Sequence, residues 1–211
     1  STLLASSAAS DVYKRQALRI FLLKKLEKFT ELFPDVKIKL TNHSTNQAVN
    51  ALKAGLVDFA VVTTPVNLTN DMKSENLCSF NDILIAGPKY KQLCNKALHL
   101  EELQEYPFIS LVEGTGTHDH YTKFFYDNDL HFNLDMEAST TDQVLAMVQS
   151  NLGLGFYPEQ LASEYIMRGE IFPVSLHESV PERDIILIRE SRHAENIAAK
   201  KLINFLKHTT N

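Results

Sequence analysis

The sequence predicts an α/β protein built from two lobes. Short apolar runs typical of buried strands alternate with segments whose apolar residues recur at helical spacing. Two polar, irregular segments, near 64–71 and 176–183, interrupt this alternation. We expect them to be two crossings between a pair of α/β lobes, so that the first lobe holds both chain ends and the second holds the middle. With 211 residues, 44% of them hydrophobic, the chain is long enough for one or two domains with a core.

The first lobe is expected to begin with a helix, because five apolar residues between Ile20 and Phe33 recur at helical spacing. Pro34 ends this helix. The next elements are a half-exposed strand at 36–40, a helix at 48–52 that stops at Gly55, and a continuous apolar strand at 58–63. Strands and helices in this order predict a parallel sheet with right-handed connections.

The second lobe continues the alternation of strands and helices. We expect strands at 77–80, 83–86, 108–112, 132–138, 154–157 and 171–176, and helices at 98–106, 118–128, 142–151 and 159–168. The inner face of the helix at 142–151 is expected to carry Val144, Leu145 and Val148. A strand at 185–188 and a last helix at 194–208 then complete the first lobe; that helix is expected to bury Ile197, Ala198, Leu202 and Phe205.

The first sixteen residues, "STLLASSAASDVYKRQ", differ in character from the rest. Their composition is of low complexity, and "DVYKRQ" resembles the translation of a transposase adapter used in sequencing libraries. We interpret 1–16 as a non-native segment at the place of a first strand and its loop; the alternative is a native strand and loop. The expected lobes are then 17–70 with 178–211, and 71–177.

Composition and charge exclude several classes of function. A net charge of −5 without a basic run argues against a nucleic-acid-binding surface. No apolar run approaches the ~20 residues that cross a bilayer, and no secretory signal is recognisable. The two cysteines, Cys78 and Cys94, could form a disulfide, but lone thiols in a reducing compartment are favoured. We therefore expect a cytoplasmic protein without a membrane partner.

Three turns between a strand and a helix share one chemistry: "NHST" at 42–45, "EGTGTH" at 113–118 and "ASTTD" at 138–142. Each leaves free backbone N–H groups at the positive end of a helix dipole. Short hydroxyl side chains add donors, and glycine lets the backbone approach a ligand, which together favour a small anion. The alternative is ordinary helix capping, since Ser, Thr and Asp are preferred N-caps in any protein. No arginine lies within these turns to narrow the choice of anion.

An enzymatic or metal-dependent function is not expected. His118 and His120, two residues apart, point to different faces of a helix, and no third ligand has suitable spacing. We expect both histidines to lie on a solvated first turn without a role in binding. The alternative is a zinc enzyme that uses this segment. There is no nucleophile elbow, and neither cysteine has a local histidine partner. We expect no catalytic residue, no metal and no cofactor.

Several segments in this order and spacing resemble the effector-binding domain of LysR-type transcriptional regulators. They are "LKAGLVDFAV", "ILIAGP", "EGTGT", "GLGFYP" and the closing "RDIILIRE", and the resemblance covers about 17–207. It implies two Rossmann-like lobes joined by two crossover segments, as in type 2 periplasmic binding proteins, with a small, anionic effector in the interlobe cleft. The effector-binding positions that it implies are Ser44, Thr45, Thr63, Thr64, Thr115, Gly116, Thr117, Thr140 and Thr141, with Phe156 lining the cleft.

Two departures from the family pattern accompany the resemblance. The first loop of the family falls on 1–16, where only Ser6, Ser7 or Ser10 could replace its ligands. The family's N-terminal winged helix-turn-helix is not in this sequence, so DNA would be contacted only through that missing domain. The resemblance implies a bacterial regulator, a homodimer or tetramer when intact. The alternative function is an extracellular solute-binding protein of a transporter.

Overall fold

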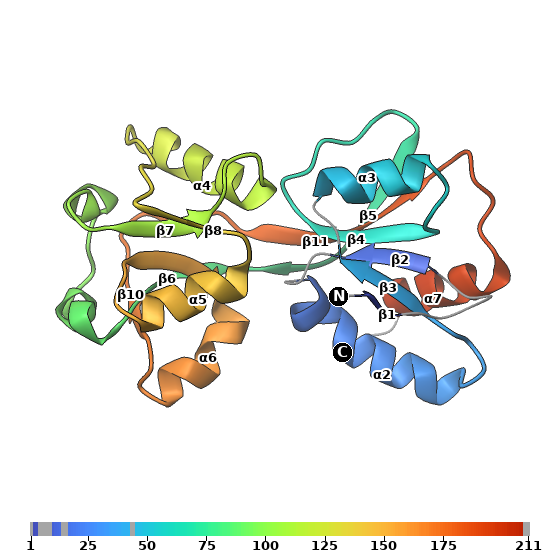
Figure 1. The fold of residues 1–211 in the computed structure, drawn as a ribbon, viewed down its shortest axis with the longest axis horizontal. Helices are drawn as coiled ribbons and strands as arrows, with labels where there is room; N and C mark the ends of the chain where they lie inside the picture. Colours follow the sequence, from blue (N-terminus) through green and yellow to red (C-terminus); the bar gives the residue numbers. More distant parts are fainter. Residues whose placement is uncertain (1, 4–9, 14–16, 43–44, 209–211) are drawn as a thin grey trace. The chain divides into compact units, whose positions relative to one another are not determined.

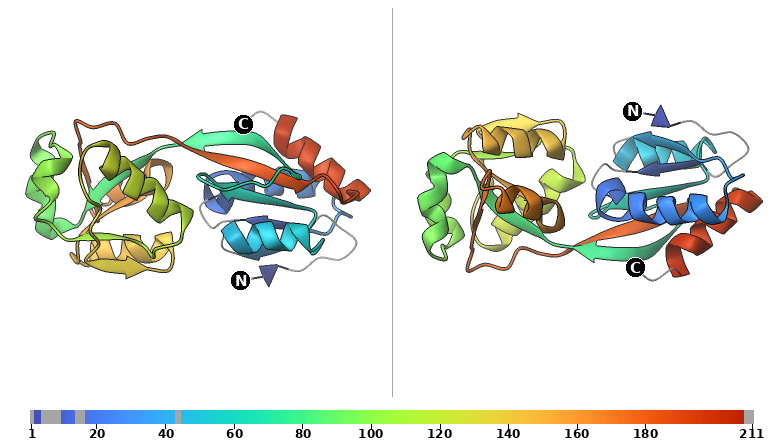
Figure 2. Two further views of the ribbon diagram at one scale, coloured as in Figure 1. Left: turned by 90° about the horizontal axis from the view of Figure 1, so that it is seen from above. Right: turned by 90° about the horizontal axis from the view of Figure 1, so that it is seen from below.

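The structure, a computed structural model, describes residues 2–3, 10–13, 17–42 and 45–208. It separates into two compact units, each with its own sheet. Unit 1 comprises Ser1–Ser79 and Asp184–Asn211, and unit 2 comprises Phe80–Arg183. The chain passes from one unit to the other twice, once along β5 and once on entering β11 (Figures 1 and 2). The units are divided at 79/80 and 183/184, later along the chain than the expected 70/71 and 177/178.

Strand pairing explains why the first division lies later than expected. The segment from Met72 to Phe80 is one long strand, β5, which is hydrogen-bonded to β11 in the sheet of unit 1. Most of its side chains are at least partly exposed. The first part of the strand, "MKSEN", therefore has few apolar residues from which a strand could be predicted. Only its end, at 77–80, was predicted from the sequence.

Within the described residues, the sheet of unit 1 has six strands in the order β1-β3-β2-β4-β11-β5. Their bounds are β1 Thr2–Leu3, β2 Ser10–Tyr13, β3 Lys39–Asn42, β4 Phe59–Thr63, β5 Met72–Phe80 and β11 Arg183–Glu190. β2 runs parallel to both β3 and β4, whereas β11 is antiparallel to β4. The sheet is therefore mixed, and its parallel part ends at β4.

The helices of unit 1 cover both faces of this sheet, with α3 above it and α2 below it in Figure 1. They are the π-helical turn Leu18–Leu22, α2 Leu23–Leu32, α3 Thr45–Lys53 and α7 Ile197–His208. Ala48 and Leu52 of α3 pack against Ala60 and Val62 of β4.

The buried face of α7 differs from the expected one. Its buried residues are Ala199, Leu202, Ile203 and Leu206. Ile197 is 76% exposed, so its expected burial was wrong. The helix starts at Ile197 and not at Ala194, and two apolar stripes overlap in its sequence. Periodicity alone could not choose between those stripes.

The sheet of unit 2 has five strands in the order β10-β6-β9-β7-β8. Their bounds are β6 Asp82–Ala86, β7 Phe108–Leu111, β8 Met136–Ala138, β9 Leu154–Pro158 and β10 Phe172–Val174. β7 is parallel to both β8 and β9, and β6 is antiparallel to β9.

Side chains alternate between the two faces of this sheet and form two separate cores. Leu84, Phe108 and Phe156 pack with α4, whereas Ile85 and Ile109 pack with α5 and α6 on the other face. Figure 1 shows α4 on one side of the sheet and α5 and α6 on the other. The helix bounds are α4 Gly116–Asp127, α5 Thr141–Gln149 and α6 Glu159–Met167.

The expected inner face of α5 is confirmed, because Val144, Leu145 and Val148 are all buried. The helix expected at 98–106 is only a short 3-10 turn, Leu100–Leu103. A second 3-10 segment, Pro88–Asn95, has no counterpart in the sequence prediction. Its sequence, "PKYKQLCN", lacks the apolar periodicity on which such predictions depend.

Candidate functional site

Two of the three anticipated turns lie side by side in unit 2. β7 and β8 are parallel neighbours, with Leu111 opposite Ala138, and the Val112 N–H donates to the Ala138 carbonyl over 3.2 Å. The turns that follow these strands therefore open from the same edge of the sheet. Ligands of open α/β sheets bind outside the carboxyl ends of strands, which is this edge.

The turn after β7 is closed by Thr115, the N-cap of α4. Its Oγ1 accepts a hydrogen bond from the His118 N–H at 3.2 Å and donates to the Val112 carbonyl at 2.9 Å. Gly114 has a positive φ of 88°, a conformation that glycine adopts at low cost. The N–H groups of Gly116 and Thr117, the first two helical positions, have no partner inside an α-helix. These two N–H groups could therefore donate hydrogen bonds to an anion.

The turn after β8 is closed more completely by its own side chains. The Gln143 N–H donates to Thr140 Oγ1 at 3.2 Å. In return, Gln143 Oε1 accepts from the N–H groups of Ser139 and Thr140, at 2.8 and 3.2 Å. This reciprocal capping box consumes amides that an anion would otherwise contact. Thr141 follows as the first residue of α5.

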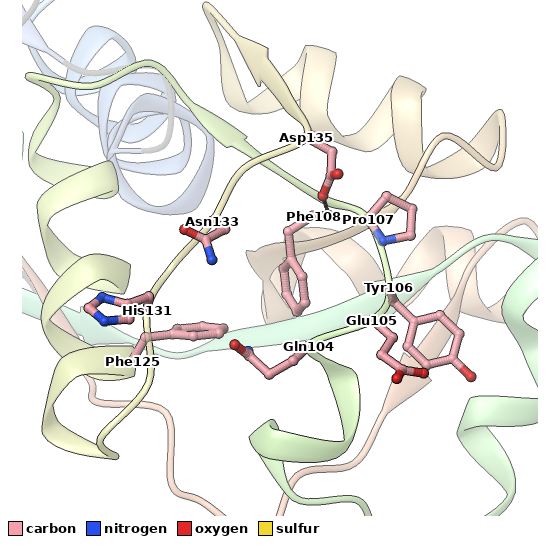
Figure 3. Close-up of a pocket in the computed structure, with 9 residues that line it drawn as sticks. All are labelled: Gln104, Glu105, Tyr106, Pro107, Phe108, Phe125, His131, Asn133 and Asp135. Atoms are coloured by element: carbon pink, nitrogen blue, oxygen red, sulfur yellow. Dashed lines mark hydrogen bonds between the residues drawn. The ribbon is translucent and has the colours of Figure 1, made fainter.

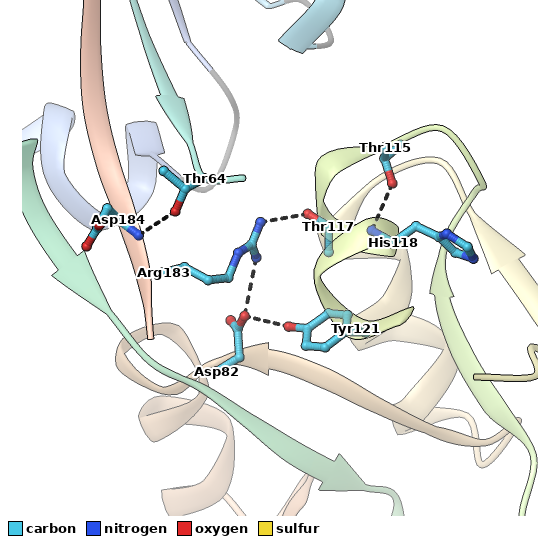
Figure 4. A network of polar contacts seen from close by, with 8 residues as sticks. All are labelled: Thr64, Asp82, Thr115, Thr117, His118, Tyr121, Arg183 and Asp184. Atoms are coloured by element: carbon cyan, nitrogen blue, oxygen red, sulfur yellow. Dashed lines mark hydrogen bonds and ion pairs between the residues drawn. The ribbon is translucent and has the colours of Figure 1, made fainter. Parts of the chain in front are cut away.

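Thr117 is held by an arginine from a distant part of the chain (Figure 4). Arg183 Nη2 donates to Thr117 Oγ1 at 2.9 Å, and Arg183 Nη1 pairs with Asp82 Oδ2 at 3.2 Å. Tyr121 Oη donates to the same Asp82 oxygen. The side chains of Arg183 and Asp82 are both 0% exposed. Burial, together with the neighbouring carboxylate, raises the pKa of Tyr121 well above its usual 10, so its hydroxyl keeps the proton that it donates.

The two histidines of the turn have different surroundings. His118 lies near the ring of Phe132, with centroids 6.0 Å apart. His120 is partly buried, and its Nε2 has no hydrogen-bond partner among the described residues. Burial, followed by the charge of Arg183, lowers the pKa of His120 to about 4. The expectation of a solvated first turn is therefore wrong for His120, which packs edge-on against Tyr121.

Of the anticipated residues of unit 1, Thr63 and Thr64 lie at the carboxyl end of β4. Thr63 ends β4 and is fully buried. Thr64 Oγ1 accepts from the Asp184 N–H, and the Thr64 N–H donates to the Asp184 carbonyl, both at 2.9 Å. Ser44, Ser6 and Ser7 lie outside the described residues, as do the side chains of Thr45, which begins α3, and Ser10, which begins β2.

Phe156 belongs to the core of unit 2. It is 5% exposed, and its ring stacks on Tyr121 with centroids 4.4 Å apart. The ring of Phe156 therefore packs against α4 through Tyr121, the residue whose hydroxyl donates to Asp82.

A separate pocket of about 210 Å³ lies at the amino end of β7, the opposite end from the EGTGTH turn (Figure 3). Its rim is polar and includes Glu105, His131 and Asp135. Its two phenylalanine rings, Phe108 and Phe125, are 3% and 1% exposed and offer a ligand little surface. Asp135 is engaged in the fold, because its Oδ2 accepts from the Phe108 N–H.

The described part of the chain also shows the state of the two cysteines and which groups could hold a metal ion or span a membrane. No group of three His, Cys, Asp or Glu residues there could hold a metal ion. Cys78 and Cys94 are free thiols, and burial raises the pKa of Cys78 to about 11, far from that of a reactive thiolate. Among the helices described, none has the length and apolar character that a membrane span requires.

The family model of the LysR substrate binding domain matches residues 17–211. The chain belongs to this family. The match begins directly after the sixteen residues that differ in character. The fold of the LysR-type effector domain, mixed α/β and like that of type 2 periplasmic binding proteins, is thereby confirmed.

Relatives of this LysR-family chain are transcriptional regulators. The regulator CysB of Haemophilus influenzae is 29% identical over 65% of this chain and 42% of its own length. The activator CmpR of Synechocystis is 26% identical over 64% of this chain and 44% of its own. The chain thus spans less than half the length of the curated relatives it matches.

Solved structures with the same fold include domains with bound small molecules. The effector-binding domain of QuiR in complex with shikimate superposes with a TM-score of 0.84 at 14% identity, covering 96% of each chain. The CcmR regulatory domain of Synechocystis in complex with 2-PG gives 0.82 at 14% identity and 95% coverage of each. A sulfate-bound mutant of the OxyR2 regulatory domain from Vibrio vulnificus gives 0.81 at 15% identity, covering 97% of this chain and 98% of its own.

Sequence reasoning missed Asp82, Tyr121 and Arg183. Tyr121 stands one helical turn after Thr117, so it shares a helix face with that threonine. Asp82 and Arg183 are the first residues of two apolar strands, which is an ordinary position for an exposed charge. Asp82 and Arg183 are 101 residues apart in the sequence, so no local sequence pattern predicts that they pair.

Proposed function

We propose that this chain is the effector-sensing domain of a LysR-type transcriptional regulator and that it binds a small anion at the EGTGTH turn. The amides of Gly116 and Thr117 would donate to the anion, aided by the positive end of the α4 dipole. Binding there would shift a population between two conformations of the domain. In an intact, cytoplasmic, dimeric or tetrameric regulator, this shift would alter DNA binding through a separate DNA-binding domain.

The arrangement of hydrogen bonds around the first turn of α4 supports this proposal most directly. Thr115 satisfies the third amide of the helix and so fixes the orientation of the first two. In the neighbouring turn, the amides of Ser139 and Thr140 donate to Gln143 Oε1. The solved neighbours with shikimate, 2-PG and sulfate are consistent with an anion, and the matched relatives favour a regulator over a solute-binding protein of a transporter.

Replacement of Gly116 by proline tests the proposed amide contact with little disturbance of the helix. Gly116 is the first helical residue, where proline is tolerated because its missing N–H has no helical partner. Thr115, at φ −90° and ψ 149°, already has the extended conformation that a residue before proline needs. G116A is the matched control, because alanine retains the N–H.

Sulfate, inorganic phosphate and shikimate should be titrated calorimetrically into the native chain and both variants. We expect at least one of these anions to bind the native chain and G116A, and G116P to lose at least tenfold in affinity at an unchanged circular dichroism spectrum. Equal affinity in G116A and G116P would refute the role of this amide. The titration should be repeated with a chain that has a family-like first strand in place of residues 1–16, because that segment stands where the family has a ligand loop. If none of the three anions binds to either chain, the proposed site is refuted.

A further inference from the structure

Arg183 is the buried link between the EGTGTH turn and the first strand of unit 2. One of its nitrogens donates to Thr117 in the first turn of α4, and another pairs with Asp82, the first residue of β6. Its guanidinium also lies over the ring of Phe80, 5.3 Å from the centroid. Residues 80 and 183 are the two ends of unit 2, so this contact joins the turn to both points where the chain enters and leaves the unit.

The surroundings of Arg183 argue against direct contact with an anion. Its side chain is fully buried, and the equally buried Asp82 carboxylate compensates its charge. An arginine has only hydrogen-bond donors, so Thr117 Oγ1 must accept from it. The remaining Asp82 interaction, from Tyr121, comes from the same helix as Thr117 and lies one turn further along. Residues four apart share a helix face, so the pair holds α4 at two successive turns.

We propose that Arg183 is a positioning residue that fixes the EGTGTH turn in its anion-binding orientation without touching the ligand. This inference rests on the proposed function for its effect on affinity, but its effect on the turn can be measured without any ligand. Arg183 acts through Thr117: the hydrogen bond to Oγ1 fixes the side chain, and with it the backbone that carries the amides of Gly116 and Thr117.

Two variants separate positioning from mere stabilisation. The double variant R183M/D82N removes both charges together and keeps a side-chain oxygen for Tyr121. It removes the hydrogen bond from Arg183 to Thr117 together with the guanidinium contact with Phe80. Neutral replacement of a buried ion pair commonly preserves the fold. The single variant D82N keeps the Arg183–Thr117 hydrogen bond and leaves the arginine charge without its carboxylate. Amide hydrogen exchange across 113–119 is measured in the native chain and in both variants, with the start of α5 as an internal reference, and sulfate binding is measured by calorimetry.

In R183M/D82N we expect exchange at 118 and 119, whose amides are hydrogen-bonded to Thr115, to be at least tenfold faster than in the native chain, with the start of α5 unchanged. We also expect sulfate affinity to fall at least tenfold. In D82N we expect the turn to stay protected and sulfate to bind no more tightly than to the native chain. Native-like exchange of the turn in R183M/D82N overturns the proposal. Tighter sulfate binding by D82N also overturns it, because an arginine that contacts the anion directly would gain from the loss of the competing carboxylate. If no anion binds either the native chain or the chain with a family-like first strand, the proposed function fails, and hydrogen exchange alone decides the role of Arg183.

Discussion

His120 should make the stability of unit 2 dependent on pH in the mildly acidic range. Burial and the nearby Arg183 lower its pKa from 6.5 to about 4. Between these two values the unfolded chain binds a proton that the folded chain rejects. The contribution of His120 is therefore fully present above pH 6.5 and is lost as the pH falls toward 4.

The size of this effect follows from the shift and the exposure of the ring. At about 1.4 kcal/mol per pKa unit, the shift gives an upper bound of about 3 kcal/mol near pH 4. Because His120 is only partly buried, solvent screening reduces this bound to roughly 1–2 kcal/mol. Between about pH 7.5 and pH 5.5, where only part of the loss has occurred, we expect unfolding to cost about 1 kcal/mol less.

Urea unfolding followed by far-ultraviolet circular dichroism measures this difference, since the chain has no tryptophan. H120Q is the matched control, because glutamine does not titrate but can still hydrogen-bond with the Pro181 backbone, as His120 does. The other histidines contribute equally to both proteins and cancel in the comparison. The carboxyls whose pKa values are lowered, such as Glu75 and Glu178, titrate below this window. The same pH dependence in both proteins, or an NMR titration of His120 with a midpoint above 6, would refute the reasoning.

Two further predictions concern the hydrogen bonds of unit 2. In a double-mutant cycle, R183M and D82N should each destabilise unit 2 by about 3–5 kcal/mol, because each leaves a buried charge without its partner. The double variant R183M/D82N should be destabilised by at least about 2 kcal/mol less than the sum of the two single variants. If the free-energy changes measured by urea unfolding are additive, the two residues are not coupled. Thr140→Val should cost about 0.5–2 kcal/mol through loss of the α5 N-cap, whereas T140S should be close to the native protein, and equal midpoints for the two variants would contradict the capping role.

Much of the fold was readable from the sequence because it depends on local patterns. The apolar run that became β4 and the inner face of α5 are continuous signals over one element, and both were placed correctly. The segments that failed lack such signals. β5 exposes much of its length, and the buried stripe of α7 competes with a second apolar stripe that begins at Ile197.

The candidate site was only partly readable, for a related reason. Thr115 and Thr140 were expected because hydroxyl residues at helix starts are a local motif, and both cap their helices. The motif does not say whether such a residue serves the helix or a ligand, since capping uses the same oxygen and the same amides. That distinction came from individual hydrogen bonds, among them the reciprocal bonds of Gln143 with Ser139 and Thr140.

The burial of Thr117 changes which groups of the turn can meet a ligand. Its side chain was expected to offer a hydroxyl to the anion, but the residue is 5% exposed and its oxygen accepts from Arg183. The Thr115 hydroxyl is also occupied, as it donates to the Val112 carbonyl and accepts from the His118 N–H. The turn therefore presents backbone amides, which can only donate. A ligand bound through amides alone must supply every acceptor itself, so the turn favours a fully ionised oxyanion over a neutral or protonated acid of the same shape.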